Sequence, residues 1–483
     1  MLFNSIDFAI FLPLVFLIYW FIGSNKVNRQ NIILLIASYF FYSWWDWRFL
    51  SLILVSTTVD YFVGIKLSNE DSIFKRKFFL FISIFFNIGL LGFFKYYNFF
   101  IYNLIQSFEF LGLTISPRSL NIILPVGISF YTFQTLSYTI DIYNKKINPT
   151  KDFVSFASFV SFFPQLVAGP IERATNLLGQ FYSARKFNYT RSVDGLRQIL
   201  WGLFKKIVIA DNCAVLVDEI FNNSDSLSGS TLVLGAVFFS FQIYGDFSGY
   251  SDIAIGTARL FGINLMKNFA FPYFSRDIAE FWRKWHISLT TWFRDYLYIP
   301  LGGSKMGLAR TILNVFIIFI ISGFWHGANW TFIIWGIFNA FLFLPLLIAK
   351  KNRTNLDVLS KGKVLPSFKD LFGITTTFIL VTFGWIFFRS ENIDHALSYI
   401  STIFSKSIAD FPSLNIPGYY TIQIILLIIF FLLIEWFGRE YNFALEKLGL
   451  KWKPIVRLIF YFGIVFIISL YIGKEQQFIY FQF

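Results

Sequence analysis

The stretch TILNVFIIFIISGFWHGANWTFIIWGIFNAFLFLPLLIA, residues 311–349, decides the fold. It contains 39 residues without an Asp, Glu, Lys or Arg, and His326 is its one side chain that titrates near neutral pH. A single straight helix of this length would measure about 58 Å, nearly twice the hydrocarbon core of about 30 Å. We therefore expect a membrane segment that breaks, at Gly323 and Gly327.

The charges around this stretch predict its orientation. Both of its flanks are basic, with Lys305 and Arg310 before it and Lys350, Lys351 and Arg353 after it. Basic loops remain in the cytoplasm, so both ends of the stretch are expected on the cytoplasmic side. A first arm over 311–322 would climb about 18 Å. His326 is then expected within the membrane or in its outer half, beside the break.

A histidine at this depth has two interpretations. It can be a neutral group that joins two helices by hydrogen bonds, or it can mark a functional site, which is the usual meaning of an ionisable group inside a membrane. The small neighbours in GFWHGANW (323–330) leave room for a substrate, and Asn329 offers an amide that could orient one. We favour the functional interpretation.

The composition of the whole chain predicts an integral membrane protein. Of its 483 residues, 56% are hydrophobic and only 14% are charged, against about 25% charged in soluble domains. Helices satisfy their own backbone in lipid, so the predicted class is all-α, with roughly eleven to thirteen membrane segments. No long linker interrupts the chain, which we treat as one domain over 1–483 with a motif-bearing core over 267–330. Further charge-free runs are 8–25, 78–94, 119–140, 153–171, 226–245, 371–388 and 411–434.

The net charge of +13 would suggest nucleic acid as the partner of a soluble protein. In a membrane protein it indicates basic cytoplasmic loops, and we predict no nucleic-acid partner. The early loops carry Lys26 and Arg29, then Lys66 and a basic group over 75–77 two crossings later, which predicts an N-terminus outside the cytoplasm. The single cysteine, Cys213, excludes an internal disulfide and a thiolate metal cluster.

A basic and aromatic belt precedes the apolar stretch. Residues 267–310 carry seven cations and three acids, a pattern typical of helices that lie at the cytoplasmic interface. Such a belt usually anchors the chain to anionic headgroups. His286 within it favours a second interpretation, in which some cations line an entry for an anionic cytosolic molecule. Asp295 could fix the tautomer of a histidine or pair with an arginine.

Other polar residues are expected to have structural roles. His395 follows a helix and is interpreted as a solvated loop or helix-start residue. Asp246 and Asp252 lie in a weakly polar stretch and need partners, for which Arg259 or Arg276 are candidates. A metal site built from His286, His326 and Asp295 has no ligand spacing to support it, so we predict no metal. Pro164 and Pro170 are expected to break their helix.

At this point the motifs resemble a known family. RDIAEFWRKWHISLTTWFRDYLYIPLGG (276–303), followed by GFWHGANW, is similar to the core of the membrane-bound O-acyltransferase (MBOAT) superfamily, in its bacterial alginate O-acetylation branch. The pieces SFYTFQTLSYTIDIY (129–143), FFPQLVAGPIER (162–173), YGDFSGYSDIAIG (244–256), GWIFFR (384–389) and the terminal FIYFQF agree. The resemblance spans nearly the whole chain and implies a ring of helices around a central funnel, with short re-entrant or interfacial helices at its floor.

The resemblance also implies site residues. His326 matches the catalytic histidine of the family and His286 matches its second histidine. His326 would act as a general base on a hydroxyl group, and His286 would orient the thioester or move a proton. The residues expected to contact substrate are Arg283, Lys284, Trp285, Arg294, Asp295, Trp325 and Asn329, with Arg283, Lys284 and Arg294 as phosphate contacts and Trp282, Trp285, Trp292 and Trp325 as walls that exclude water.

The function that follows is an inner-membrane O-acetyltransferase. Acetyl-CoA, or another cytosolic acyl thioester, would be a substrate and not a bound cofactor. The acetyl group would pass towards an extracytoplasmic polysaccharide, through a periplasmic esterase-like partner protein. Two alternatives remain: transfer of D-alanyl or another acyl group to a cell-envelope polymer, and a non-enzymatic component of polysaccharide export. The motifs do not identify the acceptor polysaccharide.

Overall fold

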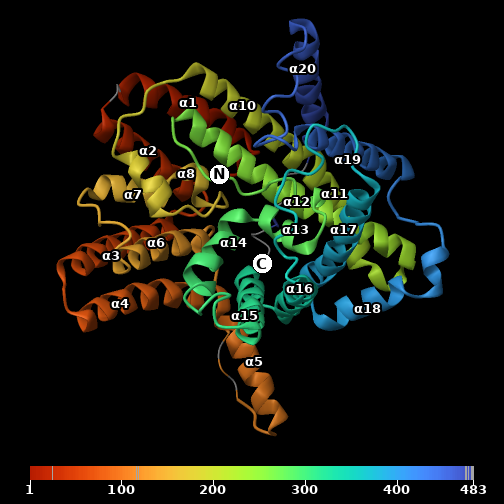
Figure 1. The fold of residues 1–483 in the computed structure, drawn as a ribbon, viewed down its shortest axis with the longest axis horizontal. Coiled ribbons are helices and arrows are strands. Elements are labelled where there is room, and N and C mark those ends of the chain that lie inside the picture. Colours follow the sequence, from red (N-terminus) through yellow and green to blue (C-terminus); the bar gives the residue numbers. More distant parts are fainter. Residues whose placement is uncertain (24–25, 116, 118, 474–475, 477, 480–483) are drawn as a thin grey trace. The chain divides into compact units, whose positions relative to one another are not determined.

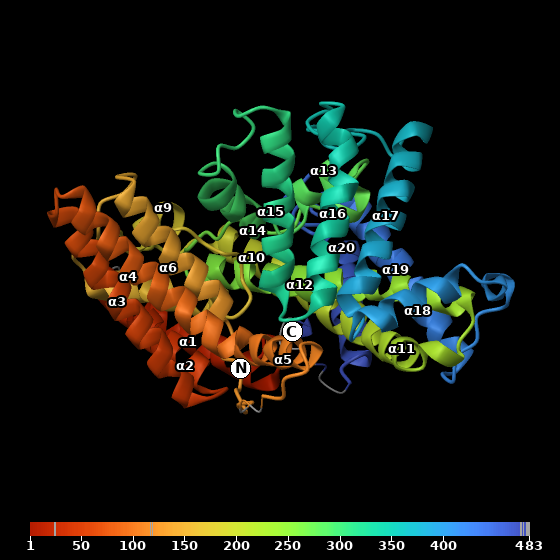
Figure 2. The same ribbon diagram turned by 90° about the horizontal axis from the view of Figure 1, so that it is seen from below.

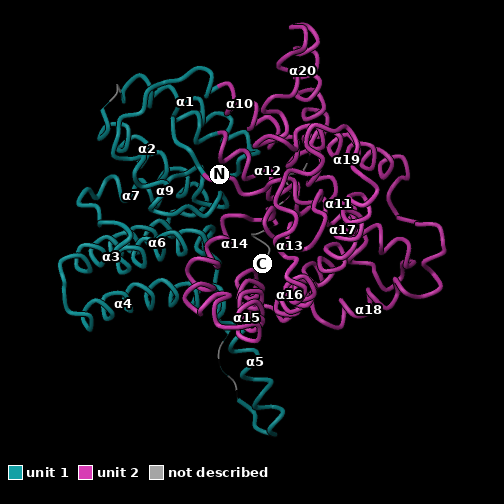
Figure 3. The backbone as a smooth tube through the Cα atoms, in the orientation of Figure 1, with its two compact units in different colours: residues 1–192, 257–265 teal, residues 193–256, 266–483 magenta. Residues whose placement is uncertain are grey.

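The computed structural model describes residues 1–23, 26–115, 117, 119–473, 476 and 478–479 (Figure 1). Within this part of the chain every regular element is a helix, which confirms the predicted all-α class. Backbone contacts divide it into two compact units, residues 1–192 with 257–265 and residues 193–256 with 266–483 (Figure 3). The sequence predicted a single domain; helices α10 (Tyr189–Leu203) and α12 (Gly229–Leu260) each contribute residues to both units.

The first unit is a set of packed helices with a buried polar group among them. Asp60 on α3 is fully buried, and it accepts hydrogen bonds from Ser83 at 2.6 Å and from Asn87 at 2.9 Å, both on α4. Buried carboxyl groups need such partners. Its elements are α1 (Ile6–Gly23), α2 (Val27–Ser43), η1 (Trp47–Phe49), α3 (Leu50–Asn69), α4 (Ile73–Leu91), η2 (Gly92–Tyr96), α5 (Tyr97–Phe110), α6 (Ile128–Tyr143), α7 (Phe153–Ser161), α8 (Phe163–Leu166), α9 (Ala174–Leu177) and η3 (Leu178–Phe181).

The second unit contains both motif histidines. Two short helices, α13 and α14, lie in sequence between the long helix α12 and the α15–α16 pair. Its elements after α10 are η4 (Phe204–Ala210), α11 (Asp211–Asn222), η5 (Ser224–Ser226), α12, η6 (Pro272–Phe274), α13 (Ile278–Lys284), α14 (Ile287–Phe293), η7 (Arg294–Tyr298), α15 (Leu308–His326), α16 (Trp330–Ile348), α17 (Phe368–Arg389), α18 (Ile393–Ile403), η8 (Lys406–Ala409), α19 (Gly418–Gly438) and α20 (Pro454–Leu470).

The apolar stretch 311–349 forms a helical hairpin, α15 and α16, which run side by side in opposite directions (Figure 2). The predicted break is confirmed at Gly327, which is extended and ends α15. The prediction was wrong at Gly323, which lies inside the helix. A Cβ atom there would collide with the carbonyl oxygen of Phe332, and one at Gly336 with that of Phe319. These two glycines therefore let the helices approach closely, and they do not interrupt them.

The first arm of the hairpin is longer than predicted. It has 19 residues, from Leu308 to His326, and so measures about 28 Å, where the sequence predicted an arm of about 18 Å ending at Ser322. Because α15 is nearly as long as a hydrocarbon core is thick, the chain reaches His326 at the end of the helix opposite to the basic flanks.

Eight helices in the described residues are long and apolar enough to cross a membrane, and Pro454–Leu470 is a shorter apolar helix. They confirm an integral membrane protein; the count of eleven to thirteen segments and the funnel stay predictions. Some of the charge-free runs are not single helices. Helix α6 starts only at Ile128, after Gly127 turns the chain with a φ of 79°. Residues 153–171 break at Phe162 and leave the helix again after Leu166, as Pro164 and Pro170 predicted.

Candidate active site

His286 and His326 line one small chamber within the second unit. The cavity has a volume of about 60 Å³. A water molecule needs only about 10–15 Å³ of such space, so the chamber accepts a few waters or a group of a few heavy atoms. Its lining residues are Trp282, Trp285, His286, Leu289, Thr290, Phe293, Ile318, Phe319, Ser322 and His326. The structure thus brings together the two histidines that are 40 residues apart in the sequence.

Aromatic rings surround the imidazole of His326, which is 4% exposed. Its ring centre lies 4.9 Å from that of Trp325, 5.3 Å from Trp335 and 5.3 Å from Phe388, all with the rings at steep angles. Edge-to-face contacts of this kind hold a ring in one plane. His326 is the last residue of α15, so the helix fixes its backbone while the rings fix its side chain.

Hydrogen bonds position His286, the residue before α14. Its Nδ1 lies 3.0 Å from Oδ1 of Asn268, and that oxygen also accepts the hydroxyl of Ser288 at 2.9 Å. Its backbone adopts the left-handed conformation, with a φ of 43°, which costs a residue other than glycine on the order of 1 kcal/mol. Burial lowers the pKa of His286 to about 3, so the ring is neutral at physiological pH.

Of the tryptophans predicted to wall the site, Trp282 and Trp285 line the chamber. Trp325 contacts both histidine rings, with its centre 6.0 Å from that of His286. Trp292 is not in the lining; its ring lies 5.0 Å from Tyr296. Sequence reasoning did not single out Trp335, Trp385 and Phe388, which pack against one another and against the site. The signal for the last two was present in the motif GWIFFR.

Arg283 and Arg294, two of the predicted phosphate contacts, have partners within the protein. Arg283 donates to the carbonyl oxygens of Asn352 and Asn355, each at 2.7 Å, and so holds the chain that follows α16. Arg294 pairs with Asp295 at 2.7 Å. Of the two roles considered for Asp295, the structure supports the pairing with an arginine, since Asn268 occupies Nδ1 of His286.

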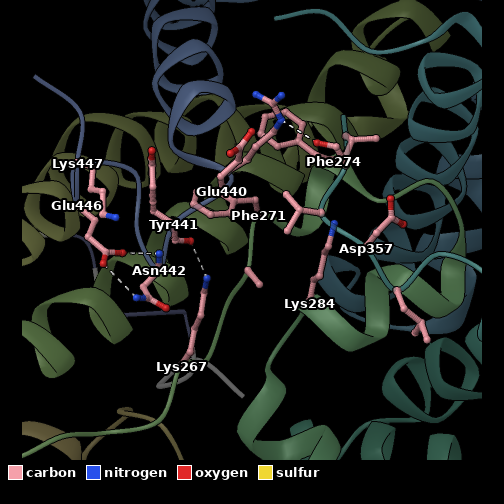
Figure 4. Close-up of a pocket in the computed structure, with 15 residues that line it drawn as sticks. Lys267, Phe271, Phe274, Lys284, Asp357, Glu440, Tyr441, Asn442, Glu446 and Lys447 are labelled. Carbon is pink, nitrogen blue, oxygen red and sulfur yellow. Dashed lines mark hydrogen bonds between the residues drawn. The ribbon is translucent and has the colours of Figure 1, made fainter. Parts of the chain in front are cut away.

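Lys284 lines a second cavity of the same unit, a cleft of about 510 Å³ (Figure 4). Its amine pairs with Glu280 at 2.8 Å. Lys267, also in the lining, donates to the carbonyl oxygen of Tyr441 at 3.2 Å. Burial lowers the pKa of Lys267 to about 8, although the carboxylates of Asp252 and Glu435 raise it. The lining is Lys267, Ala270, Phe271, Phe274, Lys284, Leu356, Asp357, Val358, Leu359, Arg439, Glu440, Tyr441, Asn442, Glu446 and Lys447.

The buried acids of α12 pair with lysines that the sequence analysis missed. Asp252 lies 2.6 Å from Lys205, and Asp246 lies 2.7 Å from Lys206. Of the two arginines predicted as candidate partners, Arg276 pairs instead with Glu280 and Asp357. The signal was the pair of lysines in FKKIVIA (204–210), because two charges inside an apolar helix require nearby acids.

Two further predicted residues have structural roles. The amide of Asn329 caps α16, accepting from the backbone N–H of Thr331 at 3.1 Å and donating to the carbonyl oxygen of Glu391 at 2.7 Å. In the structure this amide therefore caps a helix, whereas the sequence predicted that it orients a substrate. His395 lies in the first turn of α18, as predicted, with its Nε2 3.1 Å from the hydroxyl of Ser224.

No group of three or more His, Cys, Asp or Glu side chains is arranged to hold a metal ion in the described ranges. The described residues near the C-terminus lie close to the site. The backbone N–H of Ile479 donates to Asp246 at 2.7 Å. The ring of Phe478 lies 6.2 Å from Phe247, whose own ring contacts His286 at 4.6 Å. Phe478 and Ile479 therefore pack on α12 beside the chamber.

Comparison with known proteins identifies relatives that are acyltransferases. The family model of the membrane-bound O-acyltransferases matches residues 144–362, a range that includes both histidines. A protein of Pseudomonas putida named "Probable alginate O-acetylase" is 35% identical over the full length of both chains. The "Peptidoglycan O-acetyltransferase" of Helicobacter pylori is 36% identical over 83% of this chain and 79% of its own. The "Teichoic acid D-alanyltransferase" of Bacillus subtilis is 27% identical over 57% of this chain and 71% of its own.

Proposed function

Because the chain belongs to the membrane-bound O-acyltransferase family, we propose that it transfers an acetyl group from cytosolic acetyl-CoA towards hydroxyl groups of an extracytoplasmic polysaccharide. The observation that carries this proposal is the chamber, in which two imidazoles face the same small aromatic space. An O-acyltransferase needs a base for the hydroxyl proton and a site that excludes water. His326, His286 and the tryptophans around them supply both.

The chemistry needs no group beyond the chain and its substrates. Nε2 or Nδ1 of neutral His326 takes the proton of the acceptor hydroxyl as its oxygen attacks the thioester carbonyl carbon. The tetrahedral intermediate then collapses, the carbon–sulfur bond breaks, and the proton passes to the leaving thiolate. A positioned base of this kind contributes about 10²–10⁴-fold. His286 orients the thioester or moves the proton between the reactants.

Trp282 can donate a hydrogen bond to the carbonyl oxygen of the thioester. Its indole Nε1 is buried without a hydrogen-bond acceptor in the described part of the chain, and its ring lines the chamber. A donor aimed at a carbonyl oxygen stabilises the negative charge that develops there in the transition state. We assign this role to the indole N–H.

The volume of the chamber favours a short acyl group. About 60 Å³ suits an acetyl group, whose few heavy atoms need little more room than two or three waters. The side chains that limit it, among them Leu289 and Phe319, are large and buried or half-buried. A fatty acyl chain would need these residues to move apart, which costs packing energy.

The cleft lined by Lys267 and Lys284 supports an anionic donor (Figure 4). In the described residues Lys267 has no carboxylate within ion-pair distance, and burial holds its pKa at about 8. A bound phosphate would supply the missing negative charge and strengthen protonation of the amine. Lys284 lines the cleft while Trp285 and His286, the next residues, line the chamber. Acetyl-CoA could thus place its phosphates in one cavity and its thioester in the other.

The proposed acceptor is a polysaccharide outside the cytoplasm. The protein lies in the inner membrane with its N-terminus outside the cytoplasm, and a periplasmic partner protein passes the acetyl group to the polysaccharide. The names of the relatives support this class of acceptor, since they act on alginate or peptidoglycan. The similarity to a teichoic acid D-alanyltransferase favours D-alanyl transfer as the second candidate. Family membership identifies an acyltransferase, which sets the export component aside.

The deciding experiment compares cells that carry the native protein or His326→Ala at equal membrane abundance. We expect the acetate bound to the surface polymer to fall to the level of a strain that lacks the gene. Unchanged acetate would overturn the catalytic assignment. Membrane vesicles supplied with radiolabelled acetyl-CoA or with radiolabelled D-alanyl carrier protein separate the two donors, because only the proposed one transfers its label.

A further inference from the structure

The position of Asn268 determines which nitrogen of His286 carries the proton. Residues 268–270 run beside residues 284–287, joined by two backbone hydrogen bonds: Ile287 N–H to Asn268 O at 2.8 Å and Ala270 N–H to Lys284 O at 3.0 Å. This pairing places the Asn268 side chain at the start of α14. Asn268 and Ser288 are fully buried, and His286 is 2% exposed, so solvent does not compete for these hydrogen bonds.

The orientation of the Asn268 amide follows from one obligatory donor. The backbone N–H of Ser288 lies 3.3 Å from Oδ1 of Asn268, and a backbone N–H can only donate. The atom that it faces must therefore be the amide oxygen. The amide nitrogen then points to the hydroxyl of Ser251, at 3.0 Å. The flipped amide would set two donors against each other at Ser288.

The amide orientation in turn fixes the histidine. Nδ1 of His286 lies 3.0 Å from an oxygen that can only accept, so Nδ1 carries a hydrogen. Burial keeps the ring neutral, because it lowers the pKa of His286 to about 3. A neutral imidazole has one N–H and one lone pair, which leaves the lone pair on Nε2. The edge-to-face contact with Phe247, at 4.6 Å and 90°, holds the ring plane.

We propose that Asn268 is a positioning residue that holds His286 as the neutral Nδ1–H tautomer, with Nε2 as its basic nitrogen. In this state His286 acts as an acceptor of a proton or hydrogen bond at Nε2, and not as a donor. The consequence for acyl transfer rests on the proposed function, whereas the tautomer itself does not.

Magnetic resonance of labelled histidine tests the tautomer directly. The chain has only three histidines, so ¹⁵N,¹³C-histidine in the full-length protein gives three sets of signals, and the set lost in His286→Gln belongs to His286. We expect its protonated nitrogen to correlate with Cγ, as Nδ1 does. Correlation with Cδ2 instead, the mark of Nε2–H, would overturn the proposal.

Two variants separate positioning from mere packing. Asn268→Ala removes the acceptor, so we expect the His286 proton to appear at Nε2 in part of the molecules. Ser251→Ala is the matched control, because it removes a hydrogen bond from the other end of the same amide, and we expect it to leave the Nδ1–H signal unchanged. A tautomer that is the same in all three proteins would overturn the assignment to Asn268.

The pH dependence of activity tests the consequence for catalysis. Asn268→Asp keeps an oxygen for Ser288 and His286 but adds a negative charge, which raises the pKa of the histidine by about 1–3 units. Activity that needs neutral His286 is lost as the pH falls through that pKa, so the acid limb of the pH–rate profile should move to higher pH. Titratable groups on the elements around the ring include His326, Lys284 and Lys267, Glu280 and Arg283 on α13, and Asp246 and Asp252, which pair with lysines.

A profile that is lower at every pH but unchanged in shape would show that Asn268 only supports the fold, and it would overturn the positioning role. The two proposals fail separately. If the native protein transfers no acetyl group while its His286 has the Nδ1–H tautomer, the proposed function is wrong and the tautomer assignment stands.

Discussion

The two histidines of the chamber are held in different ways. His326 ends a helix of 19 residues and is enclosed by the rings of Trp325, Trp335 and Phe388. His286 precedes a helix of 7 residues, has a left-handed backbone, and is tied to Asn268 by a hydrogen bond. One imidazole is positioned mainly by the shape of its surroundings and the other by the direction of a hydrogen bond.

This difference suggests a division of work. Rings around His326 fix its position by close packing, which suits a base that gains and loses a proton in each cycle. A hydrogen bond to Asn268 commits one nitrogen of His286 and so fixes its tautomer, which suits a group that orients a reactant. The following predictions test this contrast, from the largest expected effect to the smallest.

Removal of the His326 imidazole should have the largest effect. We expect His326→Ala to lower the acetyl-transfer rate by up to about 10⁴-fold, the upper end of what a positioned base contributes. The rate is measured with radiolabelled acetyl-CoA in vesicles that contain equal amounts of each protein. His395→Ala is the matched control, since His395 lies in α18 and contacts Ser224; its rate should equal that of the native protein. Equal losses in both variants would break the contrast.

The donor assigned to Trp282 separates shape from hydrogen bonding within one residue. Trp282→Phe keeps an aromatic ring in the chamber and removes only the indole N–H. Loss of one donor to a developing negative charge costs about 10²-fold in kcat, with little change in KM if the ring keeps its place. Trp452→Phe, at a half-exposed position before α20, is the control. If Trp282→Phe has the same kcat as the native protein, the indole N–H is not a donor in the reaction and Trp282 contributes only its aromatic ring.

The sequence predicted both histidines of the site, but it predicted the local fold only around His326 and not the contacts that position His286. A charge-free stretch of 39 residues has few solutions other than a broken membrane segment, so the hairpin and the place of His326 followed. Even there, Gly323 was misassigned as a break, because a glycine that allows close helix packing and one that ends a helix look alike in a sequence.

The belt 267–310 was predicted to lie at the cytoplasmic interface, but some of its charged side chains are buried in the structure. In the structure Glu280 is 1% exposed, and hydrogen bonds and charges from Arg276 and Lys284 compensate it. Although burial alone would raise the pKa of Glu280, those partners lower it. Such pairing depends on contacts that spacing alone does not give. The role of Asn268, which lies 18 residues before His286, was invisible for the same reason.

The two lysines of the cleft, Lys267 and Lys284, test the difference between the histidines, because they are neighbours in sequence of Asn268 and His286 and not of His326. We expect Lys267→Ala and Lys284→Ala to raise the KM for acetyl-CoA about 10-fold with a smaller change in kcat, since a charged hydrogen bond to phosphate contributes about 1.5 kcal/mol or more. The KM of the native protein should rise with salt, and that of the variants should rise less. Lys361→Ala, at an exposed loop position, is the control. An unchanged KM in both cleft variants would show that the phosphates of acetyl-CoA do not bind in this cleft.

The smallest effect is expected at Gly323, where the His326 half depends on close packing. A side chain there would push α15 away from the carbonyl oxygen of Phe332, and such overpacking costs about 1–3 kcal/mol. Gly323→Val should therefore lower the Tm of the purified protein by a few °C and reduce kcat, because His326 ends the displaced helix. Gly463→Val on α20 is the matched control, since a Cβ there meets nothing within 4 Å. If both variants lose the same stability and neither loses kcat, the close approach of α15 and α16 does not position His326, and its enclosing rings must do so alone.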